Sequence, residues 1–147
     1  MKKFQFRLDA LLKYRQMQKE QAQLAFMKAS QVLHDEKAKL EQLTIKLTEI
    51  IGTFRDYQTN SLTIEVLKNF QNYFDKIREN INHQNTRVNE AQTVQQERLQ
   101  ELRQAVKNCE VVEKLKVKRL LQYQAETLSE EQKMLDELGL QNYVRKS

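Results

Sequence analysis

The chain has 147 residues, no proline, two glycines and a formal net charge of +5, and charged residues make up 31% of it. With breakers this scarce, few loops can form, so the composition favours long helices or a coiled coil over a layered core. The uninterrupted apolar runs are far shorter than the roughly 20 residues that a membrane-spanning helix needs, and the basic N-terminus lacks the apolar stretch of a secretory signal. We expect a cytosolic protein.

Sequence signatures of catalysis and metal binding are missing. One cysteine excludes an internal disulfide framework, and Cys109 falls on the apolar spacing of a helix, which favours a small core residue over a reactive thiol. His34 and His83 are far apart in the sequence and have no cysteine near them, so neither is predicted to be a metal ligand. No glycine-rich phosphate loop, zinc-protease motif or nucleophile elbow occurs. We expect no catalytic site, no cofactor and no metal, and the chain is not predicted to be an enzyme.

A heptad repeat counted from Leu12 predicts the first helix, at residues of about 4–58. Twelve of the sixteen core positions in this register are apolar, which indicates a coiled coil. The a positions are Gln5, Leu12, Lys19, Phe26, Leu33, Leu40, Leu47 and Phe54, and the d positions are Leu8, Arg15, Ala22, Ala29, Glu36, Leu43, Ile50 and Tyr57.

The helical pattern breaks at residues of about 59–63. Thr59, Asn60, Ser61 and Thr63 are turn and cap formers, because their side chains compete for backbone hydrogen bonds. Thr63 is the predicted N-cap of the next helix, and Glu65 follows in the first turn, where the helix dipole favours an anion.

A second apolar stripe predicts a second helix at residues of about 64–138. It begins with Leu67, Phe70, Phe74, Ile77, Ile81, Gln84, Val88, Ala91, Gln95, Arg98, Leu102, Ala105, Cys109 and Val112. After Val112 the stripe resumes with an offset at Val117, Leu121, Leu128, Leu135 and Leu138. Gly139 is the predicted stop, with a tail over residues 139–147.

Two long stripes joined by one short turn predict an all-α fold: a single antiparallel coiled-coil hairpin over residues 1–147. With the turn near residue 61, residue i faces roughly residue 122 − i. The first helix then ends opposite about residue 118, and the second helix overhangs. Leu121, Leu128 and Leu135 would have no partner within the chain there, which makes the overhang a binding surface or the seam of a dimer.

Positive charge gathers at the open end of this hairpin. Residues 1–19 hold six basic side chains against one acidic, and the hairpin brings them beside Lys114, Lys116, Lys118 and Arg119. One interpretation is that these basic side chains form a solvent-exposed face without a binding role. Nucleic-acid binding is disfavoured because the basic residues are interleaved with core leucines and no recognition motif appears. Direct membrane insertion is disfavoured because the stripe is committed to helix packing. The bare overhang favours an acidic socket on a protein partner.

Three stretches together resemble the FliJ family of bacterial flagellar type III export: "FQFRLDALLKYR", "LTIEVLKNFQNYFDKIRENINHQ" and "EEQKMLDEL". The resemblance implies a stalk-like coiled coil, similar to the γ subunit of rotary ATPases. Such a protein docks in the hexameric ring of the export ATPase, promotes its assembly and activity, couples it to the cytoplasmic domain of the export gate protein, and assists export chaperones. It would be cytoplasmic and peripherally associated with the inner membrane at the flagellar base.

The resemblance also implies two sets of contact residues. The export-gate-binding set is Tyr73, Ile77, Asn80, Gln84 and, on the first helix, Phe54. The ATPase-binding set is Arg7, Leu11, Arg15, Gln132, Leu135 and Asp136. Ile77 fits a position in the seam equally well. For Leu8, packing in the seam is a better explanation than contact with a partner.

Two alternatives stay open at this point. One is a generic structural coiled coil that homodimerises through the overhang. The other is the equivalent stalk of a virulence type III secretion system, which shares the architecture.

Overall fold

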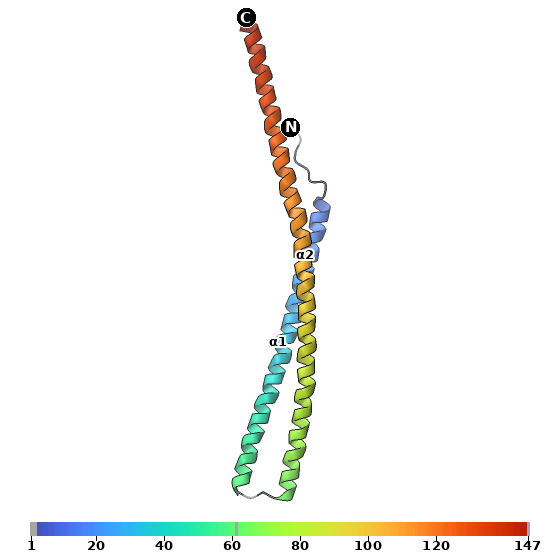
Figure 1. Cartoon of the computed structure of the whole chain (residues 1–147), viewed down its shortest axis with the longest axis vertical. Coiled ribbons are helices and arrows are strands. Elements are labelled where there is room, and N and C mark those ends of the chain that lie inside the picture. The colour runs from blue at the N-terminus through green and yellow to red at the C-terminus, as the bar shows by residue number, and fades with distance from the viewer. Residues whose placement is uncertain (1–2, 61, 147) are drawn as a thin grey trace. The chain divides into compact units, whose positions relative to one another are not determined.

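The computed structural model describes residues 3–60 and 62–146, and within them it contains two helices, α1 (Asp9–Asn60) and α2 (Ile64–Lys146), and no strand (Figure 1). The chain divides into two compact units. The hairpin unit is Gln21–Leu102, and the terminal unit combines Met1–Glu20 with Arg103–Ser147. In each unit a segment of α1 packs antiparallel against a segment of α2. The predicted all-α antiparallel hairpin is therefore confirmed.

Helix α1 begins at Asp9, so the predicted start near residue 4 is wrong. Phe4 and Phe6 precede the helix. The Phe4 ring meets the Tyr123 ring at a tilt, with ring centroids 5.6 Å apart, and Phe6 packs against the cluster around Leu12. Side chains two residues apart share a face in extended chain but not in a helix. An extended entry therefore lets both rings cover α2. Leu8, expected in the seam, lies in the turn before the helix and is exposed.

Thr63 caps the start of α2 as predicted. Its Oγ1 accepts a hydrogen bond from the Val66 amide (3.3 Å), and its carbonyl accepts one from the Leu67 amide (3.0 Å). The first bond satisfies an amide that has no partner inside the helix, and the second is the first i→i−4 hydrogen bond of α2. Glu65 lies in the first turn, where its charge complements the helix dipole.

The seam follows the predicted heptad register. From Leu12 to Phe54, every predicted a and d position of α1 is buried or half-buried, and so is the α2 stripe from Leu67 to Val112. In the hairpin unit Leu33 packs on Val88 and Ala91. These pairs lie within one helical turn of the expected antiparallel pairing.

The C-terminal part of α2 is longer than predicted. The helix passes through Gly139 and ends at Lys146, so the predicted stop and tail are wrong. Gly139 does not adopt a positive φ, and no proline follows, so a helical glycine costs only about 1 kcal/mol relative to alanine. Leu121, Leu128 and Leu135 are exposed, as predicted for an overhang without a partner in the chain, and the covered face of α2 runs through Lys116 and Tyr123.

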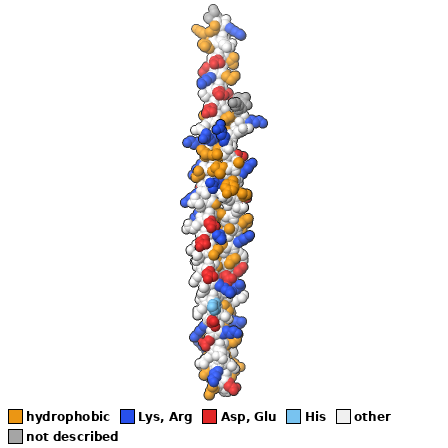
Figure 2. Space-filling model, turned by 90° about the vertical axis from the view of Figure 1, so that its right-hand side faces the viewer, with side chains coloured by type: hydrophobic (Ala, Val, Ile, Leu, Met, Phe, Trp, Pro, Cys, Tyr) orange, Lys and Arg blue, Asp and Glu red, His pale blue; other side chains and the backbone are white. Residues whose placement is uncertain are grey.

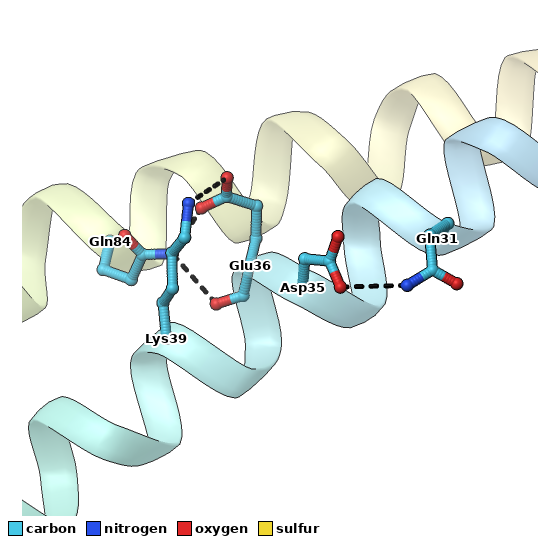
Figure 3. Close-up of polar contacts among 5 residues, drawn as sticks. All are labelled: Gln31, Asp35, Glu36, Lys39 and Gln84. Atoms are coloured by element: carbon cyan, nitrogen blue, oxygen red, sulfur yellow. Dashed lines mark hydrogen bonds and ion pairs between the residues drawn. The ribbon is translucent and has the colours of Figure 1, made fainter.

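A polar layer interrupts the apolar seam of the hairpin unit (Figure 3). Gln84 is only 6% exposed, and its Nε2 donates hydrogen bonds to the Glu36 carbonyl (2.9 Å) and to the Glu36 carboxylate. The hydrogen bond from Gln84 lowers the pKa of Glu36, with Lys39 (Nζ–Oε1 3.4 Å) acting in the same direction against partial burial. A second polar contact joins Gln95 Nε2 to Ser30 Oγ (3.0 Å). Such buried polar pairs are satisfied only in one register.

We expect the Glu36–Gln84 contact to give the helix pair acid-sensitive stability. A carboxyl whose folded-state pKa is lowered stabilises the fold above the ordinary glutamate pKa of about 4.3, and this contribution disappears as the pH falls through the folded-state value. The thermal midpoint of Glu36→Gln, followed by circular dichroism from about pH 6 downward, should fall less than that of the wild type. Glu41→Gln, at an exposed position of the same helix, is the matched control. Equal acid sensitivity of Glu36→Gln and the wild type would contradict the assignment.

Candidate partner-binding surfaces

Aromatic side chains fill the seam where α1 ends and α2 begins. The Phe54 ring meets Phe70 and Phe74 edge-on, with centroids 5.2 and 5.9 Å away, and Tyr57 meets Phe70 at 5.5 Å. Edge-to-face pairs of this kind contribute about 0.5–1.5 kcal/mol each beyond burial. Rings also hold helices farther apart than the alanines at Ala29 and Ala91 do, and Figure 1 shows α1 and α2 drawing apart toward the turn.

This spacing leaves a largely apolar groove of about 380 Å³ beside the aromatic cluster. It is lined by Ile50, Thr53, Tyr57, Val66, Asn69, Phe70 and Tyr73. Tyr57 and Tyr73 are nearly half exposed, so each offers an apolar ring and a hydroxyl to a partner. Together these seven residues form what we call the turn groove.

The structure divides the predicted gate-binding set. Tyr73 lines the turn groove, Phe54 supports it from the seam, and Asn80 is exposed on α2. Ile77 and Gln84, by contrast, are 5% and 6% exposed. Their placement on a partner-facing surface is corrected, because both occupy seam positions of the α2 stripe.

Sequence reasoning missed most of the turn groove. The heptad register places Ile50 and Tyr57 at d positions of the seam, yet both line the groove. The available signal was the surplus of aromatics in "NFQNYF", which exceeds what a two-helix seam requires. Valine and asparagine at positions 66 and 69 carry no comparable signal.

The predicted ATPase-binding residues of the N-terminal segment differ in accessibility. Arg7 is exposed in the turn before α1. Arg15 is half-buried, and its Nη1 donates to Gln18 Oε1 at 3.1 Å. Leu11, expected to point outward, packs against the buried cluster of Leu12, Cys109 and Val112. Leu11 therefore contributes to packing, and the outward part of this set is Arg7 and the accessible part of Arg15.

The terminal unit brings the two basic segments together as predicted. Lys116 Nζ lies 3.4 Å from Asp9 Oδ1, and Lys13 Nζ lies 3.8 Å from the other oxygen of the same carboxylate. Both pairs are partly exposed, so each contributes at most about 1 kcal/mol to stability. One carboxylate shared by two lysines leaves the surface basic.

In the terminal unit α2 continues past the N-terminal residues (Figure 1), which confirms the predicted overhang. Gln132, Leu135 and Asp136 are exposed there, and Gln132 Nε2 donates to Asp136 Oδ1 at 3.3 Å along the helix. Figure 2 shows hydrophobic side chains alternating with acidic and basic ones over this part of the molecule. The three predicted residues thus share one accessible stretch.

The one cysteine of the chain lies in the buried cluster of the terminal unit. Cys109 is 1% exposed in the cluster with Leu12, and burial raises the pKa of its thiol, which disfavours the reactive thiolate. Residues 3–60 and 62–146 contain no group of three or more histidine, cysteine or acidic side chains placed to hold a metal ion. In the same residues neither helix carries a window apolar enough to cross a bilayer.

A two-helix antiparallel hairpin with an aromatic groove at its turn and a basic, leucine-bearing stretch in its terminal unit is the architecture of a coiled-coil protein. The chain belongs to the FliJ family, since the family model described as "Flagellar FliJ protein" matches residues 4–147. Searches of curated proteins and of solved structures give no match. Membership makes the chain a coiled-coil protein associated with flagellar export.

We expect the aromatic cluster to contribute more to the stability of the fold than the exposed tyrosine of the turn groove does. Two alanine substitutions test this. Phe70 contacts three other rings, so Phe70→Ala should lower the free energy of unfolding by about 2–4 kcal/mol. Tyr73 is nearly half exposed, so Tyr73→Ala should cost less than about 1 kcal/mol. Urea denaturation followed by circular dichroism measures both. A Tyr73→Ala loss as large as that of Phe70→Ala would show that Tyr73 belongs to the packing.

Proposed function

We propose that this chain is the stalk-like coupling factor of the flagellar type III export apparatus. In this role its terminal unit docks in the hexameric ring of the export ATPase and promotes assembly and activity of the ring. The observation that carries the proposal is the family match over residues 4–147, which spans both units. The match is to a flagellar family, which favours the flagellar over the virulence apparatus.

The terminal unit supports the docking step. Its N-terminal residues are strongly basic and lie beside Lys116, and α2 extends beyond them with exposed leucines such as Leu135. These basic residues and exposed leucines suit binding to an acidic cavity on a partner. Opposite charge would speed association, and apolar contacts would hold the complex together. Arg7, Arg15, Gln132, Leu135 and Asp136 are the residues proposed to contact the ring.

The turn groove supports the second contact, with the cytoplasmic domain of the export gate. Half-exposed tyrosines beside an apolar hollow are the side chains that most often anchor protein interfaces. We assign this contact to Tyr73 and Asn80, supported from behind by Phe54. Export chaperones are a third proposed class of partner. The proposed location is the cytoplasm, peripheral to the inner membrane at the flagellar base.

Two substitutions that serve as controls for each other test the proposal. Arg15→Glu reverses charge in the terminal unit and should abolish the increase in ATP hydrolysis that the chain gives to the purified export ATPase, while binding to the gate domain persists. Tyr73→Ala should weaken gate binding roughly 10-fold or more, as expected for an aromatic anchor, and leave the ATPase increase intact. Turnover and calorimetric titration are the readouts.

Failure of the wild-type chain to raise turnover or to change the oligomeric state of the ATPase would contradict the docking role. Arg78→Glu, the same charge change at an exposed position of the hairpin unit, controls for net charge. If Arg78→Glu abolished the increase as fully as Arg15→Glu, the effect would be one of overall charge and not of the terminal unit.

A further inference from the structure

Residues 3–8, which we call the N-terminal strap, run beside α2 in the terminal unit before α1 begins (Figure 1). From residue 3 to residue 7 the side chains alternate between exposed and half-buried, which is the period of extended chain. The Phe4 ring meets the Tyr123 ring with centroids 5.6 Å apart, and Phe6 packs against the cluster around Leu12. Two aromatic contacts therefore hold the strap in place.

The same segment is also able to form a helix. It contains neither proline nor glycine, and the heptad register of α1 continues through it with Gln5 at an a position and Leu8 at a d position. Because α1 already exists beside it, lengthening the helix upstream avoids the costly nucleation step. The strap thus has two accessible conformations, the extended one of this structure and a helical one that continues α1.

Packing and charge both favour the extended conformation. Phe4 and Phe6 share a face in extended chain, but in a helix they point in different directions and cannot both pack as they do here. A helical strap would also set Lys3 and Arg7, four residues apart, on one face, and like charges at this spacing are destabilising. Both cations would lie near the start of the helix, where its dipole disfavours positive charge, whereas Asp9 occupies the first turn now.

An acidic partner opposes this preference. In the extended strap the backbone positions of Lys3 and Arg7 are separated by as much as about 13 Å, at about 3.3 Å per residue. In the helical strap their Cβ atoms are about 5–6 Å apart. Closely spaced carboxylates therefore pair with both cations more readily in the helical strap, and they also cancel the repulsion between the two. A ligand shifts a conformational equilibrium by the difference between its affinities for the two states, so such carboxylates favour the helix.

We propose that the N-terminal strap is a conformational switch operated by an acidic protein segment. When carboxylates of the partner pair with Lys3 and Arg7, the strap leaves Tyr123 and continues α1 as a helix. Leu8, exposed in this structure, then takes the d position that the heptad register gives it. The length of α1 thereby depends on whether the partner is bound.

The inference rests on the proposed function only for the identity of the partner, because Arg7 is among the residues proposed to contact the ATPase ring. The conformational change itself is a property of this chain. The tests therefore use the full chain with poly-L-glutamate as the acidic probe. A failure of the switch is then distinguishable from a failure of docking in the ring, which is measured with the ATPase.

The Cα chemical shifts of residues 3–8, measured by NMR on the isotope-labelled chain, report the conformation of the strap. The wild type should give extended values alone and helical values in excess poly-L-glutamate. Arg7→Glu replaces the like-charge pair by an opposite-charge pair with Lys3, so it should give helical values without the probe. Arg78→Glu, the same charge change at an exposed position of the hairpin unit, should behave as the wild type does.

Aromatic substitutions test what holds the strap extended. Phe4→Ala/Phe6→Ala removes both contacts and introduces a strong helix former, so the shifts of the free chain should move toward helical values. Tyr143→Ala, which removes a 73% exposed ring elsewhere on α2, should leave the strap extended. A wild-type strap that keeps extended values in excess poly-L-glutamate, or that is helical without it, would overturn the proposal. So would an Arg7→Glu strap that stays extended.

Discussion

The contact between two single stripes, one on each helix, is the constraint from which the other features follow. A two-helix pair can bury only the face that each helix turns to the other, so most side chains stay in water whatever their chemistry. The seam alone must fix which residues meet. Leu33 against Val88 provides burial, but leucine and valine tolerate a shift by one heptad. The hydrogen bonds from Gln84 to Glu36 do not, because a shifted register would leave a buried amide without a partner.

The same constraint explains why the apolar residues left over gather into surfaces. In the hairpin unit, rings too large for close helix packing hold the helices apart and open the turn groove beside Tyr73. In the terminal unit, α2 extends beyond the N-terminal segment that packs on it, and the leucines of this extension are exposed to solvent. Both suit recognition, in keeping with a family of flagellar export components.

Periodicity predicted the seam, the turn and the Thr63 cap because these depend on side chains close in sequence. It misplaced the start of α1, because Phe4 and Phe6 leave the helix to reach α2, and such a contact is invisible to a heptad count. Gly139 misled for the opposite reason, since a glycine marks a helix end only where the chain turns. The candidate site was predictable only in part: Tyr73 stands out as a surplus aromatic, whereas the burial of Ile77, Leu11 and Gln84 depends on which face meets the partner helix.

The intrachain antiparallel register is the central claim, and cysteine cross-linking measures it most directly. Gln95 Nε2 donates a hydrogen bond to Ser30 Oγ across the seam at 3.0 Å. Ser30→Cys/Gln95→Cys in a Cys109→Ala background should therefore be joined within one chain by a short thiol-reactive linker that spans the length of the glutamine side chain. The pair Ser30→Cys/Leu102→Cys, shifted by one heptad, should not be joined by the same linker. Mass spectrometry under dilute conditions distinguishes the products. A link in the shifted pair, or links only between chains, would contradict the account.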